Sequence, residues 1–370
     1  MARWQPSTLA RYLFVAYVPL VVYASLHPFS GWRDRGLPPF AFLTAPFPRP
    51  ILVFDVVANI IGYMPLGFLA VLAVYPWLRR SYAFGFGLAC SVLLSFALES
   101  LQLYLPTRAS SNLDLLANTV GGAVGALAAL ATTRPLMDAE GLQHLRNRLF
   151  LPGRRTDLGL VLLGLWLFAQ LSPETLLFGT GDLRDLFKTP SGKLYPAEVF
   201  LRVEAGVACA NGLAAGLLAL CLFARNQPAR GVVVIFLAAA LAVHTFGFGL
   251  LVSSQDILSW VTPGALYGVG AAILLLLVVA GMPRTTQLAL MGFALMAATA
   301  LVNLAPANPY MTASFALWQQ GHFLNFNGAT RVVSAVWPFA AMVYLVLLAA
   351  DRGQVREWEA PGDARPSQYN

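Results

Sequence analysis

Charged residues are scarce in this sequence. They make up 11% of its 370 residues, while 58% are hydrophobic and the mean hydropathy is +0.66. Ordinary soluble domains carry about 25% charged residues, so the scarcity excludes a soluble domain with one membrane anchor. The length allows many membrane spans. We therefore expect an all-α polytopic integral membrane protein.

Lysine is almost absent, and this absence weakens one class of partner. Lys188 and Lys193 are the only lysines, so the net charge of +7 comes from arginine. Most of the arginines stand at the ends of apolar runs, where basic residues set membrane topology. The positive charge therefore predicts orientation in a membrane, and nucleic acid is not an expected partner.

Cysteines are few and lie in apolar surroundings. Cys90, Cys209 and Cys221 all fall inside apolar runs, where thiols are usually inert. We predict neither a disulfide nor a metal site, and no cofactor. The first apolar run lacks an A-x-A-like cleavage site, so we interpret it as a retained helix.

Apolar runs long enough to cross a bilayer as helices recur along the whole chain. We find ten, at 9–27, 53–77, 82–105, 113–133, 157–178, 203–224, 230–252, 261–282, 285–304 and 332–350. A cytoplasmic N-terminus places the larger share of basic residues in the inside segments, as the positive-inside rule requires. Both termini are therefore predicted to be cytoplasmic.

These spans suggest two membrane domains joined by a basic segment. We predict a four-helix domain at 1–133, a cytoplasmic linker at 134–156, a six-helix domain at 157–352 and a polar tail at 353–370. The linker fits an ordinary basic connection or a short interfacial helix, because Leu142, Leu145 and Leu149 have helical spacing. The outside segment 179–202 is expected to be a solvated loop with a short helix, and the aromatic-rich segment 305–331 to lie on the outer leaflet.

Polar pairs interrupt three of the first four spans. Asp55 and Asn59, and likewise Asp114 and Asn118, are four residues apart and share one helix face. The predicted topology brings both pairs to the outer end of their helices, together with three further polar residues, Glu99, Gln102 and Arg108. Acids inside a membrane are costly and mark function by default, so these seven residues form the candidate binding site.

The chemistry of this site has three interpretations. The carboxylates and Arg108 could form a structural network that fixes helix packing. Alternatively, the cluster binds a polar lipid headgroup, with Arg108 on phosphate and the acids accepting from hydroxyls or amines. In the third, a carboxylate acts as general base or two carboxylates hold a divalent cation. The cluster has no activated nucleophile, and His27 is the only plausible addition, so the sequence leaves catalysis open.

Three segments of the first domain carry a family resemblance. DVVANIIGYMPLG at 55–67, ESLQ with the following Arg108, and DLLANTVGGAVG at 114–125, preceded by YASLHPF at 23–29, resemble the VanZ-like family of bacterial membrane proteins over about 1–133. The resemblance implies a multi-pass protein of the bacterial inner membrane with an envelope-related role. One member gives the family its association with low-level teicoplanin resistance, and no catalytic residues carry over.

These observations combine into one functional hypothesis and two alternatives. We expect membrane lipids or a lipid-linked envelope precursor to bind at the outer-leaflet cluster. A transporter or flippase is the first alternative. Against it, the later spans have few acids apart from Glu204. We interpret Asn211 and His244 in these spans as packing residues. A membrane enzyme acting on lipid headgroups is the second.

Overall fold

The computed structural model describes residues 7–36, 38, 40–137, 142–184, 195–224, 229–251, 257–306 and 324–350. Within these ranges the regular elements are 12 helices, with no β-strand beyond an isolated bridge between Phe150 and Phe223. Eight helices are long and apolar enough to cross a membrane. The predicted fold class is therefore confirmed: this is an all-α, multi-pass membrane protein.

The chain forms two compact units. The N-terminal unit comprises residues 1–148, 152–161 and 320–329, and the C-terminal unit comprises 149–151, 162–319 and 330–370. The first unit contains α1 (Thr8–Leu26), α2 (Ala41–Thr44), α3 (Val53–Val74), α4 (Ser81–Gln102), α5 (Asn112–Met137) and nearly all of α6 (Leu142–Leu149). The helices that follow are α7 (Arg154–Ala169), α9 (Ala197–Leu222), α10 (Ala229–Leu251), α11 (Pro263–Val279), α12 (Arg284–Leu304) and α14 (Leu324–Ala349).

Each of the ten predicted spans contains a helix, but two of those helices fall short of a full crossing. The helix α7 has 16 residues and α11 has 17, so eight long spans replace the predicted ten. The span predicted at 157–178 is wrong in its second half, because α7 ends at Ala169. Pro173 follows, and proline has no N–H to continue a helix.

Two predicted outside loops also need correction. The segment 179–202 is not solvated at its start, because Phe178, Gly179, Thr180 and Gly181 are buried, and α9 already begins at Ala197. Residues 185–194 lie outside the described ranges. In the segment 305–331, α14 begins at Leu324, while Tyr310, Phe315, Trp318 and Phe323 are among the residues that the structure does not describe. The same holds for the tail predicted at 353–370.

Glycines bring α3, α4 and α5 into backbone contact. A Cβ atom at Gly121 would overlap the carbonyl of Ile60, and one at Gly125 would overlap the carbonyl of Met64. On the neighbouring face of α5, a Cβ at Gly122 would overlap the side chain of Ser91. Small residues allow this close packing of membrane helices. The contact aligns α3 with α5 along their lengths.

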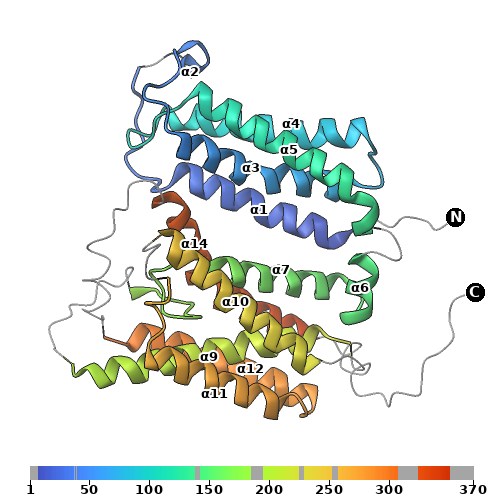
Figure 1. Ribbon diagram of the computed structural model, residues 1–370, viewed down its shortest axis with the longest axis vertical. Helices are drawn as coiled ribbons and strands as arrows, with labels where there is room; N and C mark the ends of the chain where they lie inside the picture. The colour runs from blue at the N-terminus through green and yellow to red at the C-terminus, as the bar shows by residue number, and fades with distance from the viewer. Residues whose placement is uncertain are drawn as a thin grey trace, which may run out of the picture. The chain divides into compact units, whose positions relative to one another are not determined.

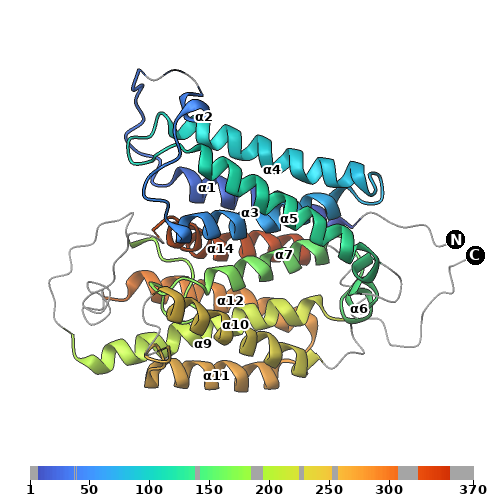
Figure 2. The same cartoon turned by 45° about the horizontal axis from the view of Figure 1, so that its top comes forward.

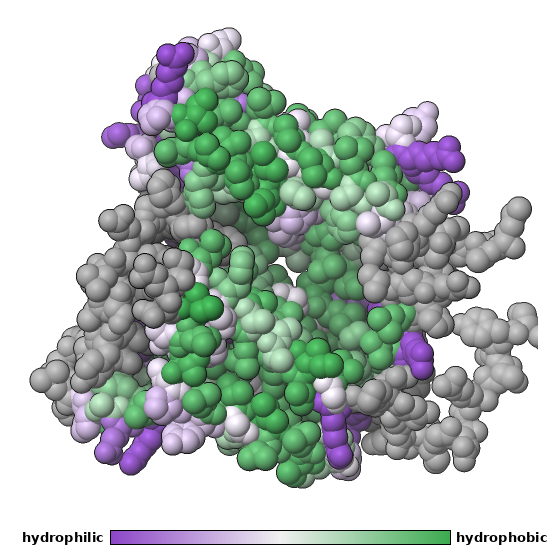
Figure 3. Space-filling model, viewed as in Figure 1, coloured by the Kyte–Doolittle hydropathy of each residue, from purple (hydrophilic) through white to green (hydrophobic). Residues whose placement is uncertain are grey.

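The helices of the N-terminal unit run side by side, so several of their ends meet. Figures 1 and 2 show the end of α1, the start of α3, the end of α4 and the start of α5 at one end of this unit, with α2 beyond them. We call this the α2 end. Arg33 N donates to Tyr104 O there, at 3.0 Å, joining the loop after α1 to the loop after α4. Apolar residues cover the sides of α4 and α5, and hydrophilic ones gather near the helix ends (Figure 3).

We predict that Gly125→Ala destabilises the protein, because the added methyl group must push α3 and α5 apart. Overpacking of this kind costs about 1–3 kcal/mol. The melting temperature in detergent, taken from the loss of helical circular dichroism on heating, measures the effect.

The matched control is Gly85→Ala on α4, where a Cβ would meet nothing within 4 Å. Its melting temperature should stay unchanged or rise slightly, because alanine restricts the unfolded chain more than glycine does. Equal melting temperatures for the two variants would contradict the backbone contact.

Candidate functional site

The two repeated Asp-x-x-x-Asn pairs meet between α3 and α5. Asn59 Nδ2 donates to Asp114 Oδ1 at 3.0 Å, so the amide of one pair holds the carboxylate of the other. Asp55 lies one turn from Asn59 and interacts electrostatically with Asp114. Asp55 is exposed, whereas Asn59 and Asp114 are half-buried. The repeat thus builds one acidic patch from two helices.

Glu99 ties the end of α4 to the start of α5. Its side chain is only 3% exposed and accepts a hydrogen bond from Ser111 N at 2.8 Å, while Ser110 Oγ donates to the Glu99 carbonyl at 2.7 Å. Ser111 Oγ in turn accepts from Leu113 N at 3.1 Å, which is N-cap geometry. A carboxylate beside a helix N-terminus is favourably placed.

Gln102 and Arg108 turn toward α1. Gln102 Nε2 donates to Ser25 O at 3.0 Å. Arg108 donates to His27 O through Nε at 3.0 Å and Nη2 at 2.7 Å, and to Ala24 O at 3.4 Å. These are carbonyls at the end of α1, which lack intrahelical partners. Burial lowers the pKa of Arg108 from its ordinary value, but an arginine in a protein stays protonated.

Asn118 lies one helical turn from Asp114 and is 5% exposed. Its Nδ2 donates to Ser95 Oγ on α4 at 2.9 Å. Its Oδ1 is buried and has no hydrogen-bond partner among the residues that the structure describes. A buried acceptor without a donor is costly, so this oxygen marks a place where a ligand donor would be stabilised.

The structure therefore brings together all seven sequence-predicted site residues at the α2 end. Four of them, Asp55, Asn59, Glu99 and Asp114, are linked directly, electrostatically or through Ser111. Asn118 lies one helical turn from Asp114, and we call the five residues together the acidic cluster. Gln102 and Arg108 instead donate hydrogen bonds to backbone carbonyls at the end of α1. His27, the suggested addition, contributes its carbonyl to Arg108, and its ring contacts the Tyr23 hydroxyl at 3.0 Å.

The sequence reasoning missed the serines of this site. Ser111 positions Glu99, and Ser95 holds Asn118. The signal for Ser111 was present, because serine just before an apolar helical run is typical of an N-cap. For Ser95 no such signal exists, since a serine inside an apolar helix commonly bonds its own backbone.

The acidic cluster occurs in turns of α3 and α5 that also expose apolar side chains. Val57 and Ile61 on α3 are exposed, as are Leu116 and Val120 on α5. Ile61 reaches 61% exposure. Exposed aliphatic side chains of this kind are what a membrane-spanning helix presents to hydrocarbon. Charged oxygens and a lipid-compatible surface therefore occur side by side on the same two helices.

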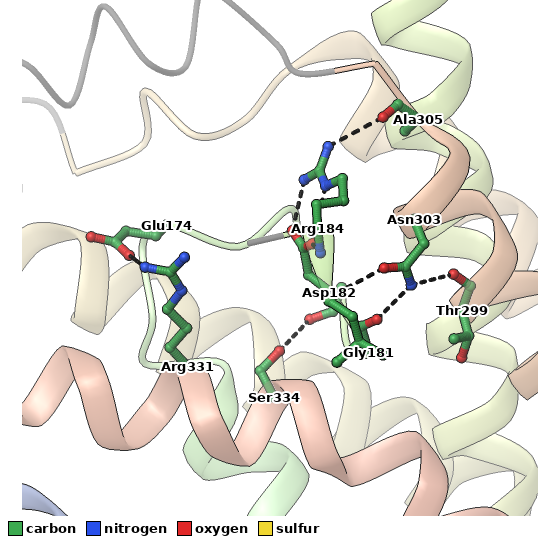
Figure 4. A network of polar contacts seen from close by, with 11 residues as sticks. Glu174, Gly181, Asp182, Arg184, Thr299, Asn303, Ala305, Arg331 and Ser334 are labelled. Carbon is green, nitrogen blue, oxygen red and sulfur yellow. Dashed lines mark hydrogen bonds and ion pairs between the residues drawn. The ribbon is translucent and has the colours of Figure 1, made fainter. Parts of the chain in front are cut away.

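A second polar network lies in the C-terminal unit, where residues 170–184 continue irregularly after α7 (Figure 4). Asn303 Nδ2 donates to Gly181 O at 2.7 Å, and its Oδ1 accepts from Leu183 N at 2.9 Å. Ser334 Oγ donates to Gly179 O at 3.0 Å, and Ser334 O accepts from Gly181 N at 2.9 Å. Buried backbone outside a helix requires partners of this sort.

Further polar residues complete this network. Thr180 Oγ1 donates to Asn211 Oδ1 at 2.6 Å, and His244 Nδ1 contacts Gln170 O at 3.0 Å, so both residues expected to be packing residues are hydrogen-bonded. Asp182 bonds Arg184. Burial alone raises the pKa of Asp182, but the hydrogen bonds and charge of Arg184, with the charge of Arg331, bring the pKa below its usual value.

We predict that Arg108→Gln lowers the free energy of unfolding by about 1–3 kcal/mol, because it leaves buried carbonyls of α1 without their donors. Arg35→Gln is the control, since Arg35 is exposed in the loop after α1 and should change stability little. Unfolding in mixed detergent micelles measures both variants. Equal stability of the two would refute the assignment of Arg108 as the partner of α1.

Comparison with known proteins covers the part of the chain that carries this site. No curated protein and no solved structure matches the chain. Residues 6–133 match the model of the VanZ/LLP1 family. The matched range contains α1 to α4, most of α5 and the whole acidic cluster, so the resemblance carried by the segments at 23–29, 55–67, 99–108 and 114–125 is confirmed for this membrane domain.

Proposed function

We propose that this VanZ-like protein binds a polar lipid or a lipid-linked envelope precursor at the acidic cluster. The observation that carries the proposal is the pairing of Asp55, Asn59 and Asp114 with exposed aliphatic side chains in the same turns of α3 and α5. An amphiphile would satisfy both features at once, with its headgroup at the carboxylates and its chains along the apolar surface. A small water-soluble ligand would interact only with the polar residues.

The membrane side of the site is part of the proposal. The distribution of arginine favours cytoplasmic termini, which would place the α2 end at the outer leaflet of a bacterial inner membrane. A lipid-linked precursor of the cell envelope is exposed at that leaflet. A changed sensitivity to glycopeptides of the teicoplanin type would be one consequence, as the family resemblance suggests.

The proposal predicts that specific lipids copurify with the wild-type protein and are depleted from Asp114→Leu. The substitution removes a carboxylate but keeps an apolar side chain that suits the membrane. Mass spectrometry of lipids extracted from the purified proteins, normalised to protein, measures the depletion. We expect a loss of at least about tenfold, the ratio for one hydrogen bond to a charged group.

The control is Asp34→Leu, because Asp34 is exposed in the loop after α1 and accepts a hydrogen bond from Gly36 N in the same loop. Its lipid content should equal that of the wild type. An identical lipid profile for all three proteins would end the lipid hypothesis for this cluster. Reporter fusions that place residues 106–112 in the cytoplasm would overturn the outer-leaflet position.

A transporter or flippase is the second candidate, and one observation favours it. The irregular segment 170–184 in the C-terminal unit, which is buried at 177–181, resembles the broken helices that line transporter pathways. A flippase would move a fluorescent lipid analogue across the bilayer of proteoliposomes, so that dithionite quenches more than the outer half. Quenching that stops at about half, with lipid still bound to the purified protein, favours binding without transport.

A further inference from the structure

Several hydrogen-bond donors of the acidic cluster and its surroundings bond atoms of the protein. Asn59 Nδ2 donates to Asp114, Ser111 N donates to Glu99, and Asn118 Nδ2 donates to Ser95. Gln102 and Arg108, at the same end, donate to backbone carbonyls of α1. Their hydrogen bonds fix the positions of the helices. A ligand that needs donors, such as a phosphate, would compete with these carbonyls and side chains for them.

The acceptors of the cluster are not used up in the same way. Asn118 Oδ1 is buried without a partner in the described part of the chain. Asp114 accepts from one side chain, at Oδ1. Glu99 is buried, and its carboxylate interacts with neutral donors, the backbone N–H of Ser111 and the side chain of Ser110. The open hydrogen-bonding capacity in this region therefore consists of oxygen atoms.

The charges point the same way. Asp114 interacts electrostatically with both Asp55 and Glu99, so the helices hold like charges close together. A cation with several N–H donors would relieve the repulsion and satisfy the oxygens together.

We propose that the acidic cluster selects a lipid headgroup bearing a protonated primary amine. This inference rests on the proposed function and names the chemistry of its ligand. The ammonium group donates to Asp114 and, one turn deeper, to Asn118 Oδ1, while Asp55 at the exposed rim attracts the positive charge. The aliphatic side chains at Ile61 and Val120 accompany the chains of the lipid.

This selectivity separates three common headgroups. Phosphatidylethanolamine carries a primary ammonium with three N–H donors. Phosphatidylcholine carries a positive charge without any N–H, and phosphatidylglycerol carries hydroxyl donors with a net negative charge. The geometry favours the first, because the carboxylates attract its charge and the buried amide oxygen requires a donor.

The experiment uses the full-length protein, delipidated in detergent and supplied with an equimolar mixture of these three lipids with identical acyl chains. Native mass spectrometry counts each lipid retained per protein. We expect phosphatidylethanolamine to exceed each of the others by about tenfold, as one charge-assisted hydrogen bond provides. The preference should disappear in Asp114→Asn and persist in the control Asp34→Asn.

A second variant guards against misfolding. Asn118→Leu removes the buried amide oxygen without changing charge, and its melting temperature shows whether it folds. A folded Asn118→Leu should lose the preference for phosphatidylethanolamine over phosphatidylcholine. Unchanged preference in both Asp114→Asn and Asn118→Leu would overturn the assignment of these acceptors.

The other outcomes are equally decisive. Retention of phosphatidylglycerol above phosphatidylethanolamine, or equal retention of all three lipids, would overturn the amine proposal and leave lipid binding standing. Equal retention of phosphatidylcholine and phosphatidylethanolamine would refute the role of N–H donors. Retention of none would refute the proposed function itself, together with this inference.

Discussion

Backbone carbonyls that cannot reach water constrain the whole structure. In a membrane each one needs a partner from the protein, and arginines supply several of these partners at helix ends. Arg108 serves the end of α1, Arg11 Nε donates to Ala73 O at the end of α3 at 3.0 Å, and Arg284 donates to Phe223 O after α9 at 2.8 Å. The guanidinium suits this role because it presents several donors and stays charged.

Close helix packing explains the arrangement of the polar residues in the first unit. Glycines bring α5 against α3, which fixes the distance between the two DxxAN segments. Asn59 then reaches Asp114 across the helix contact, and Ser111 holds Glu99 at the turn. Apolar residues such as Leu66 and Leu105 are fully buried in the adjacent core, so water does not enter from that side. Packing thus positions the carboxylates.

Helical spacing and topology were enough to predict which polar residues share one end of the first unit. Asp55, Glu99 and Asp114 lie where the alternating direction of the spans places them. The bonding of Arg108 was not predictable, because a guanidinium can donate to carboxylates, phosphates or carbonyls and the sequence does not locate the end of α1. The proposed pairing of Arg108 with phosphate therefore has no support in the hydrogen bonds that it makes.

For the segment after α7, hydropathy alone gave a wrong prediction. The segment around Phe178 is apolar enough to read as the end of a span, and the charged residues after it suggest a solvated loop. In the fold, Asn303 and Ser334 come from distant helices to satisfy this irregular backbone. Such partners are more than a hundred residues away in sequence, so no local pattern reveals them.

The two polar networks differ in how completely their hydrogen-bond acceptors and charges are matched by partners. Around Gly181, side-chain donors and acceptors meet backbone groups that need them, and the acid Asp182 has an arginine beside it. In the acidic cluster, Asn118 Oδ1 lacks a partner among the residues that the structure describes, and the carboxylates of Asp55 and Asp114 interact electrostatically. A network whose purpose is only packing gains nothing from unmatched acceptors, because each one costs stability. The mismatch has a physical rationale if a cationic donor completes the site.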